Sequence, residues 1–328
     1  MGAAAEDEPG KVNQQETNMA RALTVFIALT TGMPLSMWAQ SGTSAQNPAT
    51  TNAATQATFD SPEAAMEALI DAAANNNTAK LSALFGPNGK QILTSGDPQK
   101  DQAERQEFSQ LATRKHELQP SSMNKNVRIL TIGAEDWPFP VPIVQTNGKW
   151  RFETAQGAME MRARRIGANE LDAIEICAGY VEAQRTYAAR VRDQHGVLEY
   201  AQQIKSSPGK RDGLYWGEGS LVPEGFAGAE ILTAAASKPK PYHGYYFSVL
   251  KSQGPAAPEG QHNYVSKESM IGGFALVAWP ATYGVSGIHS FIVNQDGAVY
   301  ERDLGPRASN LTPPVNRYDP DKSWAPVN

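Results

Sequence analysis

Short apolar runs separated by glycine-containing turns dominate the C-terminal part of the chain. Between Gly244 and Gly305 these runs read YYFSVL, GGFALVAWP, GIHSFIV and GAVY. β-Branched and aromatic residues in runs of this length, divided by turn residues, are typical of antiparallel strands. The pattern predicts an antiparallel sheet, with a turn at Asp296-Gly297 between its last two strands.

A second periodicity precedes this sheet. Apolar residues step by three and four after Asn169, which predicts a long helix capped by that residue and packed against the sheet. Its stripe is formed by Leu171, Ile174, Ala178, Val181, Ala188 and Val191. Cys177, the only cysteine, lies on the apolar face, where a buried thiol is expected rather than a nucleophile. A short helix is expected over 197–204 and an extended surface segment over the proline-rich residues 306–328.

The N-terminal half begins with helices and continues with strands. Ser61 as a cap and Pro62 at the first helical position predict a helix that ends at Asn75. Two further helices are expected over 78–85 and 101–113. Predicted strands then follow over 127–132, 140–145 and 149–153, the last two being joined by an Asn147-Gly148 turn. Helices followed by an antiparallel sheet indicate the α+β class.

The first 57 residues have the pattern of an export leader. A basic residue, Arg21, precedes the apolar run ALTVFIAL, and small residues at Ala39 and Ser41 follow. This order predicts a signal peptide over 19–41 starting at Met19, with cleavage after Ser41 or, alternatively, after Ala39. Its apolar run is too short for a membrane span.

These signals divide the chain into five parts. Residues 1–18 are interpreted as an extension outside the true start, and 42–57 as a disordered, polar leader. Two domains are expected over 58–163 and 164–328. The mature protein is expected in the periplasm or outside the cell, without a stable membrane anchor once the signal peptide is removed.

Composition narrows the possible partners. The chain has 29 basic and 34 acidic residues, a net charge of −5, and removing residues 1–41 leaves −3. This mild charge argues against nucleic-acid binding. The five histidines do not stand at metal-ligand spacing, so neither a metal nor a cofactor is expected.

Recognisable catalytic motifs are absent from the sequence. The one arrangement of suitable residue types is His289 with Ser286 or Ser290 and Asp303, a weak candidate for a Ser-His-Asp hydrolase. The unusual segment EDWPFP over 135–140 is interpreted as a rigid connection whose aromatic residues cover the core of the first domain. The alternative is an exposed edge that binds a ligand or partner.

Five segments carry a resemblance to a known family. They read FDSPEAA from Phe59, WPFPVP from Trp137, RRIGANEL from Arg164, DGLYW from Asp212 and GFALVAWP from Gly273. Together they resemble a bacterial family of uncharacterised secreted proteins, domain of unknown function 2950, over nearly all of 59–328. This resemblance implies no activity and no catalytic residues.

Each half also resembles a known fold. The order of helices followed by the KWRF hairpin strand at 149–152 is similar to the nuclear-transport-factor-2-like cone fold, which often encloses a pocket. The long helix with AQRTYA at 183–188, followed by the sheet, resembles the globular part of type IV pilin-like proteins. Pilins carry a hydrophobic helix fused directly to this helix, whereas here a globular domain intervenes, which argues against the usual route of filament assembly.

Three functional hypotheses follow. The first is a non-enzymatic, exported envelope protein that acts as a binding or scaffold unit with an unknown envelope protein as partner. The second is a small-molecule binder with an apolar ligand in a pocket of the first domain, lined by Leu69, Leu84, Phe85, Trp150 and Phe152. The third is the hydrolase with His289.

Overall fold

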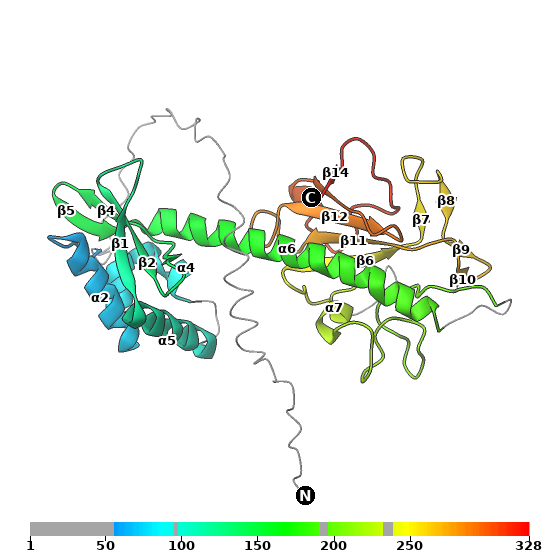
Figure 1. Cartoon of the computed structure of the whole chain (residues 1–328), viewed down its shortest axis with the longest axis horizontal. Coiled ribbons are helices and arrows are strands. Elements are labelled where there is room, and N and C mark those ends of the chain that lie inside the picture. Colours follow the sequence, from blue (N-terminus) through cyan, green and yellow to red (C-terminus); the bar gives the residue numbers. More distant parts are fainter. Residues whose placement is uncertain (1–55, 95–97, 191–195, 232–238, 328) are drawn as a thin grey trace, which may run out of the picture. The chain divides into compact units, whose positions relative to one another are not determined.

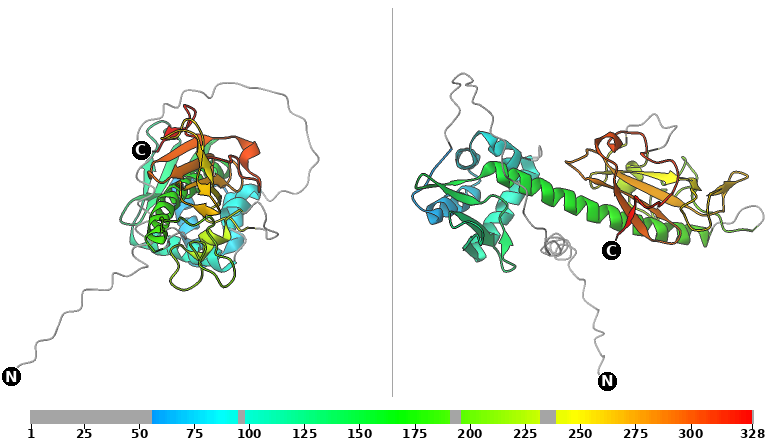
Figure 2. Two further views of the ribbon diagram at one scale, coloured as in Figure 1. Left: turned by 90° about the vertical axis from the view of Figure 1, so that its right-hand side faces the viewer. Right: turned by 90° about the horizontal axis from the view of Figure 1, so that it is seen from above.

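The computed structural model describes residues 56–94, 98–190, 196–231 and 239–327. The chain forms two compact units, the first ending at Ala163 and the second beginning at Arg164 (Figures 1 and 2). Each unit is described by itself. The predicted extension, signal peptide and all but the end of the predicted leader lie outside the described residues.

Helices of the first unit begin and end where capping residues stand. Helix α2 (Pro62–Ala74) is capped by Ser61, whose Oγ accepts the Ala64 N–H at 3.1 Å. Helix α3 (Thr78–Phe85) is capped by Asn77 and ends at Gly86, which has a φ of 66°. These helices confirm the prediction. A short 3₁₀ turn (Pro87–Gly89) and α4 (Lys90–Leu93) follow, and α5 (Pro98–Arg114) contains the third predicted helix.

The sheet of the first unit is antiparallel. Its strands are β1 (His116–Pro120), β2 (Val127–Ile132), β3 (Trp137–Pro138), β4 (Ile143–Thr146) and β5 (Lys149–Phe152). Their order is β1-β2-β4-β5, and β3 pairs with β2. Asn147 and Gly148 both have positive φ, as the predicted two-residue hairpin requires. Strand β4 begins later than expected because Pro140 and Pro142 lack the N–H that a ladder needs.

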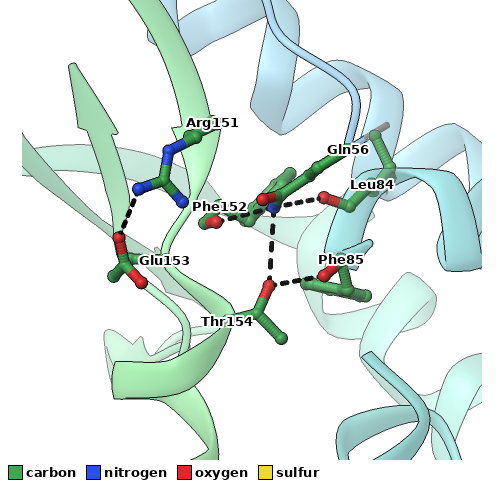
Figure 3. Close-up of polar contacts among 7 residues, drawn as sticks. All are labelled: Gln56, Leu84, Phe85, Arg151, Phe152, Glu153 and Thr154. Atoms are coloured by element: carbon green, nitrogen blue, oxygen red, sulfur yellow. Dashed lines mark hydrogen bonds and ion pairs between the residues drawn. The ribbon is translucent and has the colours of Figure 1, made fainter. Parts of the chain in front are cut away.

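Side-chain hydrogen bonds link the end of α3 to the end of β5 (Figure 3). The Gln56 side-chain amide donates to the carbonyl oxygens of Leu84 at 2.8 Å and Phe152 at 2.7 Å. The Thr154 hydroxyl donates to the Phe85 carbonyl at 2.8 Å. The last carbonyls of α3 have no partners inside that helix, so these side chains satisfy groups that would otherwise be buried without a hydrogen bond.

Helix α6 (Thr154–Ala188) differs from its prediction at both its start and its buried face. Asn169 is not a cap, because the helix continues upstream of it to Thr154 through a segment that contains Gly157 and Gly167 but no proline. Leu171 at the start of the predicted stripe is 40% exposed. The buried face includes Ala173, Cys177 and Tyr180, together with Val181 and Ala188 of the predicted stripe. Ala178 is exposed, and Val191 lies outside the described residues. Cys177 is the predicted buried thiol, and burial raises its pKa to about 12.

Within the second unit, the buried face of α6 carries one polar residue. Gln184 is fully buried, and its amide donates to the Tyr180 hydroxyl at 2.9 Å and the Ala201 carbonyl at 2.7 Å. Its carbonyl oxygen accepts the Ala201 N–H at 2.8 Å. The predicted stripe did not include this glutamine, so it is rotated relative to the buried face, with which it shares Val181 and Ala188.

The second unit contains the antiparallel sheet predicted from its apolar runs. Its order is β14-β13-β12-β11-β6. The strands are β6 (Tyr245–Leu250), β11 (Ala275–Pro280), β12 (His289–Asn294), β13 (Val299–Asp303) and β14 (Ala325–Pro326). The predicted turn at Asp296-Gly297 joins β12 to β13, with the Gly297 N–H bonded to the Asn294 carbonyl at 3.0 Å. The α+β class is therefore confirmed.

Smaller elements surround this sheet. They are the helix α7 (Glu224–Gly228), the pair β7 (Ser252–Gln253) and β8 (His262–Asn263), the pair β9 (Val265–Ser266) and β10 (Ser269–Met270), and a 3₁₀ turn (Pro306–Ala308). Helix α7 lies in a region where the sequence predicted no element.

Two predictions for the second unit are wrong. Residues 197–204 form no helix, because their backbone N–H groups bond elsewhere: Tyr200 donates to the Met270 carbonyl and Ala201 to Gln184. The segment 306–327 is more than an extended surface segment. Tyr318 and Trp324 are buried in the core, and β14 pairs with β13.

Within the described ranges, no helix has both the length and the apolar character needed to cross a bilayer.

Replacing Ser61 with alanine should lower the free energy of unfolding of the first unit by about 1 kcal/mol, since the Ala64 N–H loses its acceptor. Denaturant titration of the full chain, followed by tryptophan fluorescence, measures this change. Ser82→Ala is the matched control, because Ser82 is exposed within α3, and should change stability by less than about 0.5 kcal/mol. Equal effects of the two substitutions would show that Ser61 is not a stabilising cap.

Candidate functional site

An apolar pocket of about 700 Å³ lies within the first unit. Its floor is formed by buried residues of the core, among them Leu69, Phe85 and Ile132. Its walls are half-buried apolar side chains: Ile92, Leu93, Phe108, Leu111, Trp137, Phe139 and Met161. The volume falls in the range of about 300–1,000 Å³ that is usual for small-molecule sites.

The composition of α5 explains why this space is open. Phe108 and Leu111 are the only large apolar side chains on the helix, and the rest of it is predominantly polar. With so few apolar residues, α5 covers the core incompletely. The apolar side chains beneath and beside it therefore keep part of their surface exposed toward one cavity.

The segment 135–140 supplies another wall of the pocket. The Phe139 ring lies 5.3 Å from the Phe108 ring and 6.5 Å from the Phe85 ring, between centroids. The Phe139 N–H donates to the Leu130 carbonyl at 2.7 Å, which fixes the segment to β2. The aromatic residues therefore cover the core, as the first interpretation of the sequence expects, and they also line the pocket. Binding of a ligand or partner by this segment stays a prediction.

Of the five pocket residues expected from the sequence, Leu69 and Phe85 line the cavity. Leu84, Trp150 and Phe152 are buried in the core of the same unit instead. Phe152 packs against Phe85 at 5.2 Å between ring centroids, and the Arg128 guanidinium lies 5.3 Å from the Trp150 ring. Sequence reasoning missed the contribution of α5, although the poverty of that helix in apolar residues was visible.

Charged side chains complete the lining of the pocket. Three are basic and four are acidic: Arg105, Arg114, Lys115, Asp101, Glu104, Glu107 and Glu135. Arg105 Nε donates to Asn76 Oδ1 at 2.7 Å, and Lys115 Nζ lies 2.6 Å from Asp136 Oδ1. The bond with Asp136 raises the pKa of Lys115. Asp101 is buried and Arg105 half-buried, whereas the other five are exposed at the border of the pocket. Apolar surface inside with charges mainly at the border suits a ligand that is itself amphipathic.

The residues proposed for a hydrolase do not form a relay in the second unit. His289 Nδ1 lies 3.3 Å from Glu170 Oε2, while the other Glu170 oxygen accepts the Ile288 and His289 N–H groups at 2.8 and 2.9 Å. Asp303 stands opposite His289 on β13 but accepts the Tyr283 hydroxyl at 3.0 Å.

Neither serine is bonded to this histidine. Ser286 Oγ donates to the Thr282 carbonyl, and Ser290 follows His289 along β12, where alternation directs its side chain to the opposite face. The Ser290 hydroxyl is buried without a hydrogen-bond partner among the described residues. The geometry thus connects His289 to α6 through Glu170 rather than to a nucleophile.

Metal ligation has no support in the described ranges, where no three His, Cys, Asp or Glu side chains are grouped to hold an ion. A smaller pocket of about 260 Å³ lies beside the C-terminal segment of the second unit, with Arg302, Arg317, Asp319 and Asp321 in its lining. Arg317 pairs with Asp319 at 3.2 Å, so its charges are balanced locally.

Glu230 is a buried carboxylate of the second unit. It is 7% exposed and accepts the Ile204 N–H with both oxygens at 2.8 Å and the Lys205 N–H at 2.9 Å. Burial raises its pKa to about 7, against the lowering effect of these bonds. Its bonds to the 204–205 backbone give it a structural role in holding this irregular segment.

In structural terms, the chain is an α+β protein with an open apolar pocket in its first unit. It belongs to the DUF2950 family, described as proteins of unknown function, whose model matches residues 56–327. No curated protein and no solved structure matches the chain.

The buried Glu230 makes the stability of the second unit depend on pH. Its folded pKa of about 7 lies above the ordinary 4.5, so the folded state holds the proton more tightly than the unfolded chain. The stabilisation is complete below about pH 4.5 and is lost as the pH rises through about 7. The side chain of Glu230→Gln does not titrate, so the free energy of unfolding of this variant should not fall for this reason as the pH rises.

The measurement is the free energy of unfolding of wild type and Glu230→Gln at several pH values from about 4 to 8. The difference between the two proteins should shift in favour of the variant as the pH rises. Glu224→Gln on the exposed surface of α7 is the control and should follow the wild type. A constant difference across this pH range would contradict the assignment.

Proposed function

We propose that this chain is a binding protein that holds a small, largely apolar molecule in the pocket of its first unit. The observation that carries the proposal is the convergence of half-buried apolar side chains from α4, α5, the 137–140 segment and the start of α6 on one cavity of about 700 Å³. Apolar surface left open to water is unfavourable, and its concentration in one place marks a binding site.

The driving force would be burial of ligand and pocket surface together. Each 100 Å² of apolar surface removed from water contributes roughly 2.5 kcal/mol. The aromatic walls add shape selectivity, because Phe108 and Phe139 are held at fixed relative positions by their ring contact. The floor needs no rearrangement to receive a ligand, since its residues already belong to the packed core.

The predictions from the sequence supply the fold family of the first unit, the location and the partner of the proposed binding protein. We propose that the first unit is a nuclear-transport-factor-2-like cone, since helices against an antiparallel sheet around a cavity are what that resemblance implies. Export through the predicted signal peptide over 19–41 would place the binding function in the envelope or outside the cell. The proposed role is non-enzymatic, and the pilin-like resemblance of the second unit suggests that it contacts an envelope protein.

Filling the pocket should abolish binding of a neutral apolar dye. N-phenyl-1-naphthylamine, whose fluorescence rises in apolar surroundings, is the probe for the full chain. Leu111→Trp places a larger side chain in the pocket wall and should weaken binding at least tenfold. Gln110→Trp adds the same ring at the neighbouring exposed position of α5, outside the pocket lining, and should bind like the wild type.

A larger side chain can also disturb packing. Phe108→Ala, which enlarges the pocket, is the second variant and should change the affinity without closing the site. Circular dichroism and denaturant unfolding establish that each variant is folded. Failure of the wild-type protein to bind the dye, or unchanged binding in both pocket variants, would refute the proposed function.

A further inference from the structure

We infer that the ligand of this pocket is a single-chain amphiphile with a zwitterionic head, which carries one positive and one negative group. This inference rests on the proposed function and adds the chemistry of the head to that of the apolar tail. It is based on which of the charged side chains around the pocket already have partners and which do not.

Four of the seven charged lining residues are engaged within the protein. Arg105 bonds to Asn76, and Lys115 pairs with Asp136. Asp101 and Glu104, near the start of α5, also have interaction partners. These contacts hold the four side chains in place, and Asp136 balances the charge of Lys115.

The remaining three charged residues of the lining are Glu107, Arg114 and Glu135. All three are exposed, and none of their side chains makes a hydrogen bond or ion pair within the part of the chain that the structure describes. Glu107 and Arg114 are seven residues apart on α5, about 10 Å along the helix and on the same side of it. At that separation they do not neutralise each other as an ion pair.

A ligand head of one sign would meet opposing forces at this border. An anionic head attracted by Arg114 is repelled by Glu107 and Glu135, and a cationic head is attracted by both carboxylates but repelled by Arg114. A neutral head gains nothing from any of the three. Only a head with both charges can place a negative group at Arg114 and a positive group at a carboxylate.

The interior of the pocket determines the kind of tail that the ligand carries. The floor and walls are apolar, and the Phe139 ring lies near those of Phe85 and Phe108. A volume of about 700 Å³ is in the range for one drug-sized molecule, so a single alkyl chain is a better fit than a two-chain lipid.

The experiment compares four probes that share a twelve-carbon chain and differ in the head. They are dodecylphosphocholine, dodecyl sulfate, dodecyltrimethylammonium and dodecyl maltoside, titrated calorimetrically into the full chain below their critical micelle concentrations and at low salt. Dodecylphosphocholine should bind about fivefold tighter than each of the other three, the size expected from exposed ion pairs. This preference should shrink at high salt.

Charge-removing variants assign the preference to named residues. Arg114→Gln should weaken dodecylphosphocholine and dodecyl sulfate and leave dodecyl maltoside unchanged. Glu107→Gln should weaken dodecylphosphocholine and dodecyltrimethylammonium but strengthen dodecyl sulfate. Arg162→Gln, which removes an exposed charge of the same unit outside the pocket lining, is the control and should alter none of them.

The outcomes separate the two proposals. Equal affinities for all four heads, or tightest binding of a head with a single charge, would overturn the inference while leaving the apolar pocket intact. A preference for dodecylphosphocholine that survives in both Arg114→Gln and Glu107→Gln would also overturn it. If no probe binds, including the neutral dye, it is the proposed function that fails.

Discussion

The first unit depends on one constraint: α5 must cover the open side of a mixed helix-and-sheet core with only two large apolar side chains. Phe108 and Leu111 reach that core, and the polar majority of the helix cannot follow them. Closing the space would require apolar residues at positions that carry Asp101, Glu104 and Arg105. The cavity is thus a direct consequence of composition, and the half-exposed state of the aromatic residues opposite α5 follows from it. Next to the cavity the core is packed directly, since Phe152 is fully buried and its ring contacts that of Phe85.

The second unit has a different constraint: much of its backbone lies outside regular helices and strands, and its polar groups need other hydrogen-bond partners. Segments without a ladder need other partners for their N–H and C=O groups. Gln184 on α6 satisfies both the N–H and the carbonyl of Ala201, and Glu230 receives the N–H groups of Ile204 and Lys205. Two buried polar side chains therefore hold a stretch that forms neither helix nor sheet. Their hydrogen bonds offset the cost of burying them, whereas an unbonded amide or carboxylate there would be strongly unfavourable.

Elements with a clear local signal could be predicted from the sequence. Ser61-Pro62 and Asn147-Gly148 determine the conformation of their own neighbours, so the start of α2 and the β4–β5 hairpin followed from a few residues. The start of α6, the irregular course of 197–204 and the buried position of Tyr318 depend on distant partners that no local pattern reveals. The residues of the pocket also divide into those that local sequence predicts and those that depend on distant contacts. Leu69 and Phe85 belong to the apolar stripes of their helices and could be named, whereas the walls from α5 and the 137–140 segment arise from incomplete packing in three dimensions.

The charge around the pocket has two physical origins that can be distinguished. Acidic residues in the first turn of a helix and basic residues in the last turn complement the helix dipole, which accounts for Asp101 and contributes to the presence of Arg114. The dipole gives no reason for a carboxylate in the middle of α5 beside an apolar cavity, where Glu107 stands, nor for Glu135 beyond the end of the helix. Ion pairing within the protein does not account for them either, since neither has such a partner within the described residues. The charges without a structural explanation are therefore mainly those at the border of the pocket, where a ligand with a charged head would meet them.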